Sequence, residues 1–93
     1  MIRYLDLLKE RVGIPTEVTV YDRDIALYYE DSLDDMRSSG VPAQYLEDPQ
    51  NHPQVLTAAS LYIKAYLGND RSDTELYLDL YRKKVSRLAL EGD

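Results

Sequence analysis

Apolar residues recur every three or four positions in four separate segments of this chain, and polar residues fill the positions between them. The segments cover residues 2–12, 22–39, 53–67 and 74–90. Because this spacing places the apolar side chains on one face of a helix, each segment is predicted to form an amphipathic helix. Residues 42–46 are expected to form one short helical turn. The predicted fold class is therefore all-α, a small helical bundle of about four helices plus a short helical turn.

Glycines mark the expected ends of these helices. Gly13 follows the first segment, Gly40 follows the second and Gly68 follows the third. Glycine adopts without strain the left-handed backbone conformation that commonly closes a helix, so the three glycines predict three helix ends. After Gly13 comes Pro15, which cannot continue a helix.

The expected helix starts have their own signals. Asp22 is predicted to cap the second helix with its side chain. Pro53 suits the first position of the third helix, because the amide that proline lacks would have no intrahelical partner there. Ser72, followed three residues later by Glu75, has the form of a capping box and is expected to begin the last helix.

The segment between the first two helices is ambiguous by propensity. Residues 16–21, TEVTVY, alternate in polarity and are rich in β-branched side chains, which favours a strand. The chain offers no second comparable run with which such a strand would pair. We therefore expect an extended connector near residues 14–21.

The apolar faces predict how the helices pack. The third helix has the widest face and is expected at the centre of the fold; its residues are Val55, Leu56, Ala59, Tyr62, Ile63 and Tyr66. The second helix is expected to bury Ile25, Tyr29, Ser32, Leu33 and Met36. The last helix offers Tyr77, Val85 and Leu88, together with either Leu80 or Tyr81.

Composition narrows the class of protein. A chain of 93 residues with 44% hydrophobic and 30% charged residues is expected to form one small globular domain over residues 1–93. It has no apolar run near the roughly 20 residues that a bilayer requires. Its first ten residues mix charges among apolar positions, unlike a signal peptide, so we expect an intracellular, unprocessed protein. The absence of cysteine excludes disulfides and thiol chemistry, and with a single histidine, His52, zinc would lack its usual ligands.

Charge and aromatic content bear on the partners. The chain has 17 acidic and 11 basic residues, a net charge of -6, which opposes nonspecific binding to phosphate backbones. Nine tyrosines occur with no phenylalanine or tryptophan. Tyrosine suits surfaces that are apolar on one side and wet on the other, so these residues fit either the edge of a small core or a protein interface.

Candidate catalytic and metal sites are weak. Glu30, Asp31, Asp34 and Asp35 are expected on the solvent-exposed face of the second helix, where nothing would perturb their pKa values. Asp70, Asp73 and Glu75 lack the twelve-residue frame of a calcium loop, and capping explains the last two. His52 is expected to serve as a surface or capping residue. We therefore predict no catalytic residue, no metal site and no cofactor.

A basic cluster lies toward the end of the last helix, formed by Arg82, Lys83, Lys84 and Arg87. Cations there complement the helix dipole, at roughly 0.3–1 kcal/mol each when exposed. A helix-turn-helix that reads DNA would present the start of its second helix to the bases, and here that start carries Asp73, Glu75 and Asp79. The cluster suits an acidic protein surface better than DNA.

Two runs of residues resemble a known family: YDRDIALYYEDSLDDMRSSGVP and LTAASLYIKAYLGNDRSDTELYLDLYRKKVSRLAL. Their helix lengths, helix ends and aromatic positions are similar to those of the head–tail connector, or adaptor, proteins of long-tailed bacteriophages and prophages. The similarity spans about residues 20–90.

The resemblance implies a structural, non-enzymatic role in the virion. It implies a homo-oligomeric ring that assembles in the host cytoplasm beneath the portal protein after DNA packaging, extends the DNA channel and joins the head to the next head-completion or tail protein. It implies DNA passing through that channel with no specific recognition, and no membrane. An acidic chain fits this role, because a channel that repels phosphates lets DNA slide.

Two surfaces are hypothesised to make the contacts of such a ring. We expect Arg82, Lys83, Lys84 and Arg87 to contact the portal or a neighbouring subunit. We expect Glu30, Asp31, Asp34 and Asp35 to face the channel or those basic residues. The alternative function is a small helical protein-interaction or regulatory module without a virion role, and a third is a DNA-binding regulator.

Overall fold

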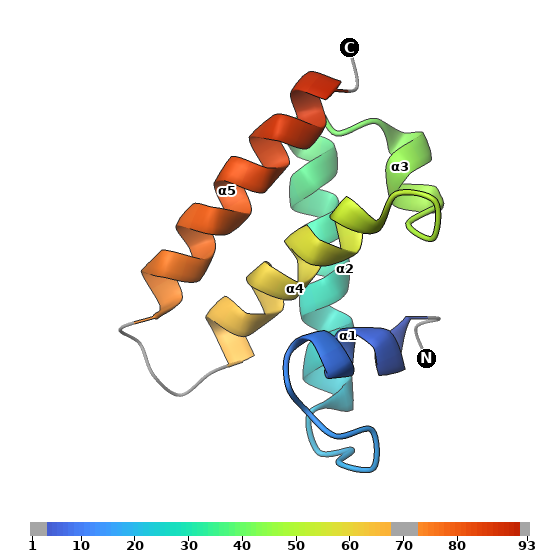
Figure 1. Cartoon of the computed structure of the whole chain (residues 1–93), viewed down its shortest axis with the longest axis vertical. Coiled ribbons are helices and arrows are strands. Elements are labelled where there is room, and N and C mark those ends of the chain that lie inside the picture. Colours follow the sequence, from blue (N-terminus) through green and yellow to red (C-terminus); the bar gives the residue numbers. More distant parts are fainter. Residues whose placement is uncertain (1–3, 68–72, 92–93) are drawn as a thin grey trace.

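A computed structural model describes residues 4–67 and 73–91 of the chain. These residues form α1 (Leu5–Arg11), α2 (Asp22–Ser38), α3 (Ala43–Glu47), α4 (Pro53–Leu67) and α5 (Thr74–Glu91), arranged as Figure 1 shows. No strand occurs among the described residues. The all-α prediction is therefore confirmed, with α3 as the expected short helical turn.

Glycine closes α1 and α2 as predicted. Gly13 and Gly40 have φ angles of 80° and 101°. After α2, the Val41 amide donates to the Met36 carbonyl at 3.0 Å and the Gly40 amide to the Arg37 carbonyl at 3.2 Å. This pair of bonds is a Schellman motif, and the same pattern closes α1. Gly68 and Ser72, which the sequence assigns to the next turn, lie outside the described residues.

The prediction that Asp22 caps α2 is wrong. Asp22 is the first helical residue, and the N-cap is Tyr21, whose side chain makes no capping hydrogen bond. The Asp22 carboxylate instead forms an ion pair with Lys9 of α1, with 2.8 Å between Oδ1 and Nζ. The Asp22 side chain thus contacts another helix and not the backbone of its own helix. Capping propensity, which is a local signal, does not predict such a contact.

The connector over residues 14–21 forms no strand, as expected, and bends through two turns. The Val18 amide donates to the Pro15 carbonyl at 3.0 Å, and the Asp22 amide donates to the Thr19 carbonyl at 3.2 Å. Lys9, only 1% exposed, also donates from Nζ to the Thr16 carbonyl at 2.8 Å. One buried ammonium group thus joins α1, the connector and the start of α2.

α4 lies at the centre of the fold, in agreement with its wide apolar face. It packs against α5, α2 and α1, and Figure 1 shows α5 running antiparallel beside it while α2 crosses behind. Val55, Leu56, Ala59 and Ile63 are buried as predicted. Tyr66 differs from the prediction, because 47% of its surface is exposed.

The sequence left open whether Leu80 or Tyr81 of α5 is buried, and the structure buries Tyr81. Tyr81 is 3% exposed and joins Val85 and Leu88 in the core, whereas Leu80 is 41% exposed. Tyr77 is half-buried. The helix therefore presents an outer side on which leucine and basic side chains meet solvent. Among the described residues, no helix is both long and apolar enough to span a bilayer.

Candidate functional site

The acidic face of α2 consists of Glu30, Asp31, Asp34 and Asp35, and all four side chains are exposed. They lie opposite the buried side of the helix, where Ser32 and Met36 meet the core. Asp34 pairs with Arg37 one turn later, at 3.0 Å. Such an exposed pair contributes little to stability, so the face keeps most of its negative charge for a partner.

Asp35 has a second role that the sequence did not reveal. Its Oδ2 accepts a hydrogen bond from the Tyr81 hydroxyl of α5 at 2.7 Å. Burial, followed by the hydrogen bond to Asp35, raises the pKa of Tyr81 above its usual range. Asp35 therefore helps to hold α5 in place as well as contributing to the acidic face.

Tyr81 is one end of a row of four tyrosines between α2, α4 and α5. Ring centroids are 5.2 Å apart for Tyr81 and Tyr62, 4.8 Å for Tyr62 and Tyr66, and 5.8 Å for Tyr66 and Tyr28. Burial is also the main cause that raises the pKa of Tyr62. These four tyrosines serve contacts between helices, which supports the core-edge interpretation for them.

The basic residues predicted on α5 wrap around its exposed side. Arg82, Lys83 and Arg87 border an open hollow of about 380 Å³ together with Ser86 and Leu90. Lys83 pairs with Asp79 of the same helix, with 3.1 Å between Nζ and Oδ2, and its side chain is 73% exposed. Arg82 also borders a hollow of about 220 Å³ that includes Asp35. Arg82, Lys83 and Arg87 are exposed, whereas Lys84 is half-buried.

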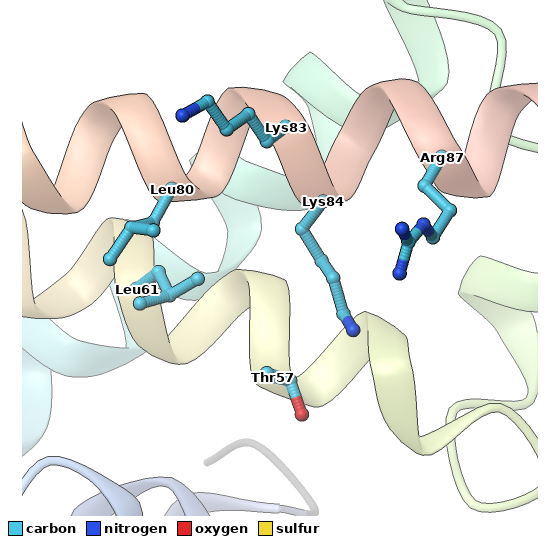
Figure 2. Close-up of a pocket in the computed structure, with 6 residues that line it drawn as sticks. All are labelled: Thr57, Leu61, Leu80, Lys83, Lys84 and Arg87. Atoms are coloured by element: carbon cyan, nitrogen blue, oxygen red, sulfur yellow. The ribbon is translucent and has the colours of Figure 1, made fainter.

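A groove between α4 and α5 combines part of this basic cluster with apolar surface. The α4–α5 groove, about 320 Å³, is lined by Thr57, Leu61, Leu80, Lys83, Lys84 and Arg87. Figure 2 shows Leu80 and Leu61 facing each other between the two helices, with Lys84 reaching from α5 toward α4. The groove therefore has an apolar floor and a cationic rim.

Arg11 of α1 forms a hydrogen bond with Thr57, one of the residues that line this groove. Its Nη1 donates to the Thr57 hydroxyl at 3.0 Å. The two residues are 46 positions apart in the sequence, so no local pattern could predict this contact. The groove itself was missed for the same reason, since its walls come from two helices.

The remaining sequence candidates are not brought together into a reactive site. His52 stacks on Tyr45, with 4.1 Å between ring centroids. Asp70 lies outside the described residues, and Glu75 is exposed in the first turn of α5. In residues 4–67 and 73–91, no three His, Asp or Glu side chains are grouped to hold a metal ion.

The described residues form a small all-α fold with an acidic face on α2 and a basic side on α5. Residues 4–93 match the sequence profile of the family described as phage connector protein, and the chain belongs to this family. No curated protein and no solved structure matches the chain in the corresponding comparisons.

Proposed function

We propose that this protein is a structural head–tail connector that assembles as a ring beneath the portal after DNA packaging. The ring extends the DNA channel and joins the head to the next head-completion or tail protein. Membership of the phage connector family supports the connector role. The observation that carries the ring is the pair of exposed, oppositely charged surfaces on α2 and α5.

A contact between unlike surfaces of identical subunits can repeat from one copy to the next. Such a heterologous contact generates a closed ring when the rotation between copies completes a circle. The acidic face of α2 and the basic side of α5 are complementary in charge, and complementary charges favour one mode of docking over others. The molecule is also flat, with extents of 39 × 30 × 16 Å, a shape that suits side-by-side packing.

The net charge of -6 fits passage of DNA through the ring. A negatively charged lining repels the phosphate groups of DNA, so the DNA slides through the channel without being bound. In this proposal Arg82, Lys83, Lys84 and Arg87 contact the portal or a neighbouring subunit. Glu30, Asp31, Asp34 and Asp35 face the channel or the basic residues of that neighbour.

Co-assembly with the cognate portal tests the proposal. Electron microscopy of portals mixed with the protein is expected to show ring-shaped density added at one end. The double variant Lys83→Glu with Lys84→Glu is expected to weaken this assembly without changing the circular-dichroism spectrum. Its control, Gln44→Glu with Gln50→Glu, also makes the chain more acidic, at exposed positions outside α2 and α5, and is expected to assemble.

Two results would contradict the proposal. Portals that gain no density show that the protein is not a connector at this position, and leave a helical interaction module without a virion role. Equal loss of assembly in both double variants shows that net charge, not the basic side of α5, governs docking.

A further inference from the structure

We propose that the α4–α5 groove of one copy receives the outer face of α2 from a second copy, with Leu27 as its central apolar contact. This inference rests on the proposed function, whose ring requires a lateral contact, and it names the two surfaces that make that contact. It selects the neighbour, and not the channel, as the partner of the outer face of α2.

The groove supplies an apolar floor inside a cationic rim. Leu80 is 41% exposed although it points toward Leu61 across the groove (Figure 2). Lys83, Lys84 and Arg87 form the rim. Lys83 has an acidic partner within the chain, Asp79, but that pair is exposed and readily exchanged for another. An occupant with an exposed apolar side chain among carboxylates would match both features.

The outer face of α2 has that composition. Leu27 is 54% exposed and lies on the side of the helix opposite Ile25, Tyr29 and Met36, which are buried. Asp24 lies one turn before Leu27, and Glu30 and Asp31 lie one turn after it. Arg23 is the one cation at this spacing, so the surroundings of Leu27 remain acidic.

A second copy fits the groove better than other occupants because both surfaces belong to the same chain. They are present in equal numbers in any assembly, and their charges are opposite. Leu27 is 54% exposed and is not among the residues that line the groove of its own chain. The contact joins unlike surfaces, and each copy therefore retains a free groove and a free α2 face for the next neighbour.

Disulfide trapping tests this contact, because the chain contains no cysteine. One variant carries Leu27→Cys and another carries Leu80→Cys, and the two are mixed and treated with a mild thiol oxidant. A disulfide forms only when the two Cα atoms approach within about 7 Å. We expect several-fold more mixed dimer than with Gln44→Cys, an exposed α3 position, in place of Leu27→Cys.

Charge reversal gives a second readout on the same pair. Adding Lys84→Glu to the Leu80→Cys variant is expected to lower the yield of mixed dimer. Adding Asp31→Lys to the Leu27→Cys variant is then expected to restore it, because the pair of charges is exchanged. A chain carrying both cysteines is expected to give a ladder of oligomers in place of a single dimer.

Three outcomes would overturn the inference. The first is a yield of mixed dimer no higher than that of the Gln44→Cys control, and the second is a predominance of Leu27→Cys homodimers. The third is a Leu80→Cys variant that couples to the portal and not to a second copy.

Portal binding by the reduced variants is measured in parallel. Binding without trapping rejects only this inference, whereas trapping without binding rejects only the proposed docking on the portal.

Discussion

The Tyr81 hydroxyl of α5 donates a hydrogen bond to Oδ2 of Asp35 on α2, at 2.7 Å. The same hydroxyl lies 3.3 Å from the carbonyl oxygen of Ser32, on the preceding turn of α2. α5 packs mainly against α4, and this hydrogen bond links the basic helix directly to the acidic one. It helps to fix the relative position of the two charged surfaces.

Removing the Tyr81 hydroxyl is expected to weaken the fold. Tyr81→Phe keeps the ring but loses the bond to Asp35, and we expect the free energy of unfolding to fall by about 1–2 kcal/mol. Urea denaturation followed by circular dichroism measures this loss. Tyr21→Phe is the control, because Tyr21 is 41% exposed and surface changes usually stay within about 0.5 kcal/mol. Equal stabilities for the two variants would show that the bond to Asp35 adds nothing.

Stability is expected to fall in alkaline solution because buried tyrosines resist ionisation. Burial, aided by the negative charge of Glu30, raises the pKa of Tyr29 to about 12, and the pKa of Tyr81 is also raised. Unfolded tyrosine ionises near pH 10, so above that pH the unfolded chain binds fewer protons than the folded one. The stabilisation is complete below about pH 10 and is lost as the pH rises through the folded pKa values.

The size of the effect can be isolated by comparing variants. Each such tyrosine lowers the free energy of unfolding by at most about 1.4 kcal/mol per pH unit in this window. Urea denaturation at pH 9 and pH 11 is expected to show a steeper decline for the native chain than for Tyr81→Phe. Parallel declines would mean that Tyr81 ionises equally easily in both states.

Gly40 is expected to resist substitution for a backbone reason. Its φ of 101° lies where side chains are strained, and an added Cβ would lie 3.7 Å from the Ala89 Cβ, an ordinary contact. The cost of Gly40→Ala therefore comes from the backbone and is expected at about 1–2 kcal/mol. Ser39→Ala is the matched control, since Ser39 has an ordinary φ of -87°. Thermal unfolding that does not separate the two variants would contradict this account.

The helices were predictable because their signals are local. Gly13, Gly40 and Pro53 act on the backbone at their own positions, so the predicted ends of α1 and α2 and the start of α4 agree with the structure. The exposure of Glu30, Asp31, Asp34 and Asp35 follows from helical spacing alone and was also anticipated. Whether these residues form an interface stays a prediction.

The contacts between helices were not predictable from the same signals. Leu80 and Tyr81 are adjacent in sequence, and only the packing of α5 on α4 and α2 decides which one is buried. The α4–α5 groove, the row of tyrosines and the hydrogen bond from Arg11 to Thr57 each join residues far apart in the chain. Lys9 is the clearest case, because a lysine in a short amphipathic helix normally predicts exposure.

Replacing the buried Lys9 is expected to cause the largest loss of stability among these changes. Its Nζ lies 2.8 Å from both Asp22 Oδ1 and the Thr16 carbonyl oxygen. Lys9→Met keeps the apolar stem but leaves the Asp22 carboxylate without its cation. Breaking a buried pair costs about 3–5 kcal/mol. The Asp22 side chain is 21% exposed, and water can partly replace the lysine, so we expect about 2–3 kcal/mol.

The exposed pair on α5 provides the matched control. Lys83 lies 3.1 Å from Asp79, at nearly the same separation as the buried pair, but its side chain is 73% exposed. Lys83→Met is therefore expected to change the free energy of unfolding by no more than about 0.5 kcal/mol. Adding Asp22→Leu to Lys9→Met is expected to recover part of the loss, because no uncompensated charge then remains. If urea denaturation gives equal losses for Lys9→Met and Lys83→Met, burial does not strengthen the pair, and Lys9 does not hold the connector to α1 and α2.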